Sequence, residues 1–221
     1  MTDRPIIFSG PMVKALIGGR KTQTRRIIKP QPEQNVAGLW VWPPDWVKGI
    51  ARYGVAVQTN EAGLIQTLMY DPARCVGYAP GDRLWVREAH RCNGWATDVA
   101  TVFYRASEGD GYTAMCEQWP IADHKPLPVS MQWRPSIHMP RWASRLTLIV
   151  TDVRVQRLQN ISEDDARAEG AKPWTGACQS YVTDFAAIWR AINGPDTWDA
   201  NPWVVALTFD VHRGNIDEVQ P

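Results

Sequence analysis

The sequence is poor in cysteine and histidine, and neither residue occurs in a spacing that binds metal. The four cysteines are scattered without a Cys-x-x-Cys pair, and the four histidines form no His-Glu-x-x-His motif. Structural and catalytic zinc sites usually show such pairs. The nearest approach is His90 with Cys92 on an expected strand, which we interpret as ordinary packing. The sequence therefore predicts no metal and no other cofactor.

Long apolar runs and an excess of charge of one sign are also missing. No stretch of about 18 apolar residues is present, so no membrane-spanning helix is expected. The first residues include Asp3 and lack a signal peptide's apolar stretch, and scattered free thiols fit a reducing compartment. Lys and Arg number 24 against 23 Asp and Glu, which excludes coating of nucleic acid or membrane by bulk charge. We expect a cytoplasmic protein without membrane contact.

The chain does contain enough apolar material for a core. Hydrophobic residues make up 44% of the 221 positions and charged residues 21%, a balance that excludes disorder. Tryptophan is abundant, with 12 copies. Such rings can stack on bases or sugars, but the simpler interpretation is that they fill the core and the undersides of loops.

The hydrophobic pattern predicts strands interrupted by a few helices. Strands are expected at residues 5–8, 20–28, 83–88, 145–158 and 202–211. Helices are expected from Ser9 to the glycines at 18–19, at 162–170 and at 178–193. Stretches rich in Pro, Gly and Trp at about 30–80 and 106–140 are interpreted as insertions. The order predicts an α+β fold, a small, mostly antiparallel barrel with flanking helices and Trp-rich loop insertions in one domain over 1–221.

The densest chemical signal is a basic run at residues 20–29. It contains no acid and five cations, which are Arg20, Lys21, Arg25, Arg26 and Lys29. Such a run could hold a phosphate, a carbonyl oxygen or nucleic acid, and the alternative is a solvated basic face. Thr24 and Arg26 share one face of the expected strand, whereas Thr22 and Arg25 are expected to point away from them toward solvent.

Lys21 and Thr24 together could form an activated nucleophile. A partly buried lysine among other cations can have its pKa lowered until a neutral amine is available. A neutral amine beside a hydroxyl group is the minimal apparatus for nucleophilic attack. The two residues are three apart, so they converge only if the chain bends at about residues 18–21.

Several segments resemble a known family. Residues 19–26 read G-R-K-T-Q-T-R-R, similar to the G-R-K-T-x-T-x-R signature of the ASCH domain, and 81–86 resemble its G-D-x-L-x-V strand. Residues 162–170 resemble the helix after the family's long central strand, and 203–209 its closing strand. Residues 134–145 are similar to a segment of larger ASCH proteins often encoded in phages and prophages. This resemblance implies a PUA-like β-barrel.

The resemblance also implies an activity. One small bacterial branch of the family hydrolyses N(4)-acetylcytidine to cytidine and acetate without a metal, using a Lys, a Thr and a Glu. Carried over to the matching positions, the implied catalytic residues are Lys21, Thr24 and Glu169. Beside them we name Arg26, Thr22 and Glu88 as candidate substrate-binding residues.

Both carboxylates, Glu169 and Glu88, also have simpler interpretations. Glu169 precedes Gly170 at the end of an expected helix, where the helix dipole disfavours an acid, so it could be a surface residue. Glu88 follows Arg87 and could form a structural ion pair with it.

Three functions are therefore weighed. The first is an amidohydrolase on acylated cytidine or cytosine, in which Lys21 activates Thr24 and Glu169 moves a proton. The second is a non-catalytic module for RNA or a modified nucleobase, and the third is a ribonuclease. Near-neutral charge disfavours long nucleic acids, and the lack of a His pair or an acid cluster disfavours the nuclease. We expect a nucleoside substrate, with RNA as the alternative partner, and favour a monomer.

Overall fold

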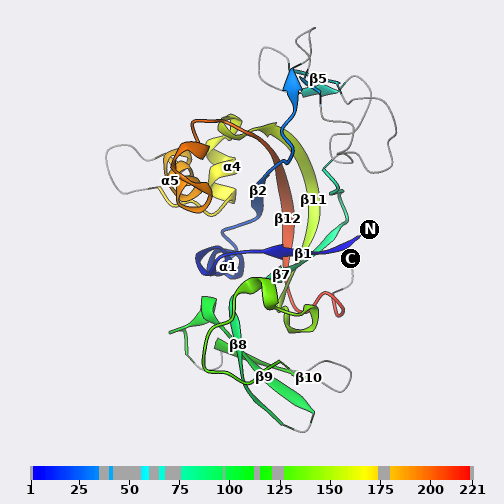
Figure 1. Cartoon of the computed structure of the whole chain (residues 1–221), viewed down its shortest axis with the longest axis vertical. Coiled ribbons are helices and arrows are strands. Elements are labelled where there is room, and N and C mark those ends of the chain that lie inside the picture. Colours follow the sequence, from blue (N-terminus) through cyan, green and yellow to red (C-terminus); the bar gives the residue numbers. More distant parts are fainter. Residues whose placement is uncertain are drawn as a thin grey trace. The chain divides into compact units, whose positions relative to one another are not determined.

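The chain divides into two compact units, each built from separate stretches of sequence. The computed structural model describes residues 2–34, 40–41, 56–59, 65–67, 76–96, 98–111, 115–120, 127–173 and 180–219 (Figure 1). The first unit comprises residues 1–21, 81–150 and 210–221. The second unit comprises residues 22–80 and 151–209.

The sheet of the first unit combines one parallel and several antiparallel pairings. Strand β1 (Asp3–Ile7) runs parallel to β7 (Arg83–Arg87), and β7 pairs antiparallel with the start of β11 (Leu146–Arg157). The end of β12 (Trp203–Arg213) lies beside that start. Burial alternates along β7, as expected for a strand with one face in the core.

A second sheet of the first unit is a three-stranded antiparallel meander. It contains β8 (His90–Trp95), β9 (Val99–Tyr104) and β10 (Cys116–Pro120), with an irregularity between Cys92 and Gly94. Short 3-10 helices connect the strands at η2 (Arg105–Ser107), η3 (Ser136–His138) and η4 (Arg141–Ala143). Side chains of this sheet and of the segments that follow it form a buried hydrophobic cluster. Its members are Cys92, Ala100, Val102, Tyr104, Trp119, Leu127, Met139 and Ala143.

Helix α1 (Gly10–Ile17) begins and ends as its sequence predicts. Ser9 takes the extended N-cap conformation, and a proline stands in the first turn. Gly19 has a φ of 67°, a left-handed conformation that glycine adopts without strain and that stops the helix. The backbone N–H of Lys21 then donates to the carbonyl of Ala15 at 3.1 Å, so Lys21 is held against the end of α1.

The second unit contains the strand formed by the basic run. Strand β2 (Gln23–Ile27) pairs antiparallel with the first part of β12, with Thr24 opposite Leu207. The second part of β11 lies on the other side of β12. A separate antiparallel sheet has four short strands, β3 (Glu33–Gln34), β4 (Trp40–Val41), β5 (Ala56–Thr59) and β6 (Ile65–Thr67).

Two helices of the second unit pack together over a buried cluster. Ser162 caps α4 (Glu163–Ala168) by accepting a hydrogen bond from the Asp165 N–H, and α5 (Tyr181–Asn193) packs against α4 (Figure 1). The connecting segments include η5 (Leu158–Asn160) and η6 (Pro195–Thr197). The cluster contains Leu158, Ile161, Ala166, Ala171, Phe185, Trp189 and Val204.

The predicted fold class agrees with the structure at the level of its elements. The chain is α+β with mostly antiparallel sheets and few helices, and each predicted strand and helix has a counterpart. No closed barrel is found among the described residues. The described residues of the stretch at 106–140 include β10, η3 and the end of η2, which the sequence did not predict, while residues 112–114 and 121–126 lie outside the described part. Most of the predicted insertion at 30–80, and positions 178–179 of the predicted helix, lie outside the described residues. None of the described helices is long and apolar enough to cross a membrane.

Candidate functional site

Glu169 is buried next to two arginines of the basic run. It is the C-cap residue of α4 and is only 8% exposed. Arg25 Nη1 donates to Glu169 Oε1 at 3.2 Å. Burial lowers the pKa of Arg26, and the nearby charge of Glu169 opposes that shift. The surface alternative for Glu169 is therefore wrong, because its carboxylate lies in a cationic setting inside the second unit.

Arg25 is the centre of a buried polar network that the sequence did not predict. Its Nη2 donates to Asp165 Oδ2 at 2.8 Å, and its Nη1 also donates to the Gln23 side chain at 2.5 Å. Gln23 and Arg154 in turn donate to the other oxygen of Asp165. The expectation that Arg25 faces solvent is wrong, because Asp165 and Glu169, four apart on α4, offer a pair of acceptors that compensate burial of the guanidinium.

Thr22 and Thr24 occupy different environments on the same segment. Thr22 is exposed, as expected, and its backbone N–H donates to the carbonyl of Ala168 at 2.8 Å. This bond ties the start of β2 to the end of α4, where Glu169 lies. Thr24 is 1% exposed, so its hydroxyl group belongs to the interior of the protein.

Arg26 is half-buried and lies near both Glu169 and Tyr78. Burial lowers the pKa of the Arg26 guanidinium, and the charges of Glu169 and Tyr78 oppose that shift. A partly desolvated guanidinium interacts more strongly with an anion than one in water does. Arg26 is therefore suited to stabilise negative charge on a bound group.

Lys21 is fully buried in the first unit. Its Nζ lies 5.7 Å from the centre of the Phe8 ring, and its backbone is held by the end of α1. Lys21 is the last residue of its unit's first stretch, and the next residue, Thr22, begins the second unit. The structure thus groups Thr22, Thr24, Arg26 and Glu169 in the second unit, with Lys21 and Glu88 in the first.

Glu88 forms an ion pair, but its partner differs from the expected one. Both oxygens of the Glu88 carboxylate accept from Arg145, at 2.8 and 3.1 Å, and both residues are buried. The predicted pair with Arg87 is wrong, because the Arg87 guanidinium instead donates to the carbonyls of Met139 and Ile137. Burial raises the pKa of Glu88, and the neighbouring Arg145 opposes that shift.

His90 and Cys92 are both buried on β8, as their alternation predicts. His90 Nδ1 lies 3.2 Å from the backbone oxygen of Glu88, and the Cys92 thiol donates to the carbonyl of Gly94 at 3.5 Å. Burial lowers the pKa of His90 to about 4 and raises that of the Cys92 thiol. Within the described residues, no group of three or more His, Cys, Asp or Glu side chains could hold a metal ion.

The chain was also compared with known proteins. No family model, no curated protein and no solved structure matches it.

Proposed function

We propose that the protein is an amidohydrolase that removes the acyl group from the exocyclic nitrogen of N(4)-acylated cytidine or cytosine. The proposal begins from the resemblance of residues 19–26 to the ASCH signature, with its PUA-like barrel. The observation that carries it is the burial of Glu169 between cations of that same segment. A buried carboxylate beside cations is a group that can move a proton on a bound substrate.

The first step would be attack by Thr24 on the acyl carbon. A neutral Lys21 amine takes the proton of the Thr24 hydroxyl group as the bond from Oγ1 to the acyl carbon forms. Burial of Lys21 supports this role, since desolvation disfavours the charged form of an amine. Arg26 stabilises the negative charge that develops on the acyl oxygen, a contribution typically worth about 2.7–4 kcal/mol per donor.

The second step would be release of cytidine. The bond from the acyl carbon to the exocyclic nitrogen breaks, and the proton that Lys21 took from Thr24 passes through Glu169 to the departing nitrogen. Water then cleaves the ester on Thr24, so that acetate leaves and the Thr24 hydroxyl group is restored. Proton delivery by a positioned group is worth about 10²–10⁴ in rate.

The test is release of cytidine from N(4)-acetylcytidine, followed by ultraviolet absorbance with EDTA present. We expect turnover by the parent protein and a loss of about 10²–10⁴ in kcat/KM for Lys21→Met and for Glu169→Gln. The matched controls are Lys29→Met and Glu108→Gln, which change exposed side chains of the same types. Circular dichroism would verify that every variant is folded.

Absence of turnover on acetylated and benzoylated cytidine by the folded parent would overturn the proposal. Binding of these compounds without turnover would favour the non-catalytic module. Cleavage of RNA that is equal in the parent and in Lys21→Met would instead indicate a nuclease that does not use this site.

A further inference from the structure

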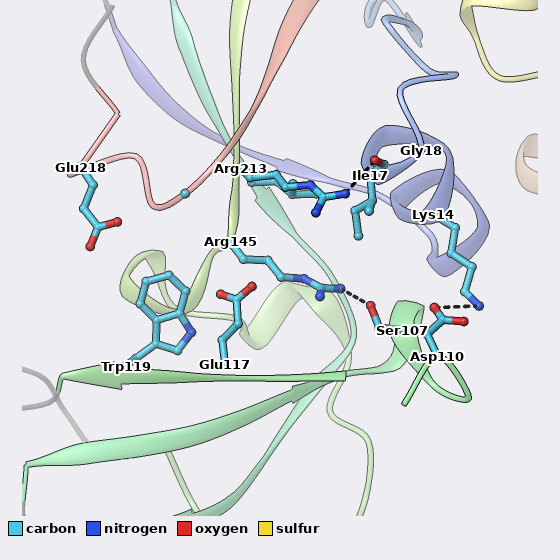
Figure 2. A pocket seen from close by; sticks show the side chains of 12 residues that line it. Lys14, Ile17, Gly18, Ser107, Asp110, Glu117, Trp119, Arg145, Arg213 and Glu218 are labelled. Atoms are coloured by element: carbon cyan, nitrogen blue, oxygen red, sulfur yellow. Dashed lines mark hydrogen bonds and ion pairs between the residues drawn. The ribbon is translucent and has the colours of Figure 1, made fainter. Parts of the chain in front are cut away.

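The first unit contains a pocket that the proposed function does not use. Its volume is about 680 Å³, a size typical of small-molecule sites. The walls come from the end of α1, the turn after η2, strand β10, the start of β11 and the segment that follows β12 (Figure 2). All lining residues belong to the first unit.

The charges in this pocket are divided between two sides. Figure 2 shows Glu218, Trp119 and Glu117 on one side, while the guanidinium groups of Arg145 and Arg213 point toward α1 on the other. Lys14 and Asp110 also line the α1 side, where they form an ion pair with each other at 3.5 Å and so add little net charge. Such an arrangement presents a negative region and a positive region to the same small volume. A ligand with both charges would match it better than a ligand with only one.

The two guanidinium groups are held in place by the protein. Arg145 donates to both oxygens of Glu88 and to Ser107 Oγ, and its guanidinium carbon lies 4.0 Å from the centre of the Tyr104 ring. Arg213 Nη2 donates to the carbonyl of Ile17 at the end of α1, at 3.1 Å. The orientation of the buried Arg145 is therefore fixed before a ligand binds, whereas the exposed Arg213 is held by this one hydrogen bond.

The negative side contains Glu117, whose carboxylate has no hydrogen-bond or ion-pair partner among the described protein groups. Glu117 is half-buried on β10. It stands two residues before Trp119, so the two side chains lie on the same face of the strand. Burial raises the pKa of Glu117, with the charges of Arg145 and Arg213 opposing and those of Glu88 and Glu218 adding to the shift. A ligand that donates N–H groups would supply the half-buried Glu117 carboxylate with hydrogen bonds, which favours binding.

We propose that this pocket binds a small zwitterion of the α-amino-acid class with an apolar or aromatic side chain. The ammonium group donates to Glu117, with Glu218 adding negative charge and the Trp119 ring adding a cation–π contact. The carboxylate faces Arg145 and Arg213. Ile17, which also lines the pocket and is half-buried, provides apolar surface for the side chain.

Ligands of a single charge fit less well. A phosphate or another simple anion would approach the arginines but would also meet Glu117 and Glu218. A simple monocation would be attracted by these acids but repelled by Arg213 and, less strongly, by Arg145, whose charge is partly compensated by Glu88. The zwitterion satisfies both sides, and this inference does not depend on the amidohydrolase proposal.

The test is isothermal titration calorimetry of the full-length protein with three related probes. L-Phenylalanine carries both charges, N-acetyl-L-phenylalanine lacks the ammonium group, and L-phenylalaninamide lacks the carboxylate. We expect saturable binding of L-phenylalanine and at least about tenfold weaker binding of both blocked probes. Glu117→Gln should weaken L-phenylalanine binding by a similar factor, while Glu108→Gln, outside the pocket, should leave it unchanged.

Several outcomes would overturn the proposal. These are no saturable binding of L-phenylalanine or L-leucine up to about 10 mM, equally tight binding of a blocked probe, or full affinity in a folded Glu117→Gln variant. Should Glu117→Gln fail to fold, Glu218→Gln provides the same test from the second acid of the pocket. Binding of cytidine in competition with L-phenylalanine would show that the pocket recognises a base edge instead.

Discussion

The guanidinium of Arg25 lies against the carboxylate of Glu169, with Nη1 3.2 Å from Oε1, although 144 positions separate the two residues in the chain. The contact joins strand β2 to the end of α4 inside the second unit. Arg25 also binds Asp165, one helical turn earlier, so one side chain of the basic run holds two acids of α4. This contact therefore fixes Glu169, the proton donor of the proposed reaction, beside the signature segment.

Replacement of Arg25 by Met should destabilise the protein strongly. The change leaves Glu169 and Asp165 without their shared partner, and breaking a buried ion pair costs about 3–5 kcal/mol. Asp165 keeps Arg154 and Gln23, so a loss near the lower end of that range is expected. Urea denaturation would measure it, with the exposed Arg20→Met as the control.

Adding Glu169→Gln to Arg25→Met should recover part of this loss, because the buried charge that faced Arg25 is removed together with it. Equal midpoints for Arg25→Met and Arg20→Met would show that the network contributes nothing to stability.

The stability of the first unit should depend on the protonation of His90. Burial holds the pKa of His90 at about 4, against 6.5 for an exposed histidine. As the pH falls from about 6.5 to 4, the unfolded state takes up a proton on His90 that the folded state does not, so the free energy of unfolding decreases. The contribution is up to about 3 kcal/mol.

The comparison that isolates His90 is between the parent and His90→Gln, each denatured with urea at several pH values. The parent should lose more stability than the variant over this pH range. NMR titration of the His90 ring gives the pKa directly, and a value near 6.5 would contradict the account.

Tyr104 should contribute through its hydroxyl group as well as its ring. The hydroxyl group accepts from Trp119 Nε1 at 2.7 Å and donates to the carbonyl of Ala143 at 2.9 Å. Tyr104→Phe leaves both buried partners unsatisfied and should destabilise the protein by about 1–3 kcal/mol. Tyr181→Phe is the matched control, since no hydrogen bond of its hydroxyl group is found within the described part of the chain. Thermal unfolding of the two variants should separate them, and identical melting temperatures would refute this role.

The elements could be predicted from the sequence more completely than the site. Hydrophobic alternation and capping residues are local signals, so α1, β7, β11 and β12 appear close to their expected positions. The ion-pair partners of the site residues, by contrast, lie far away in the sequence. The sequence places Arg87 next to Glu88, yet the fold pairs Glu88 with Arg145, 57 positions away.

Arg25 shows the same limit in another form. Strand alternation predicted a solvent-facing side chain, because it considers only neighbours along the chain. The spacing of Asp165 and Glu169 on a predicted helix was the available signal that a buried cation lay opposite. The sequence does not show which strand packs against α4, so this spacing alone could not identify Arg25 as the partner.

The most direct test of the central claim is hydrolysis of N(4)-acetylcytidine by the parent, Thr24→Val and Thr24→Ser under single-turnover conditions. Valine keeps the shape of threonine without its hydroxyl group, and serine keeps the hydroxyl group. We predict that the parent and Thr24→Ser release cytidine, and that Thr24→Val is slower by at least about 10². Release of cytidine by Thr24→Val at the parent's rate, or no release by the folded parent, would contradict the claim.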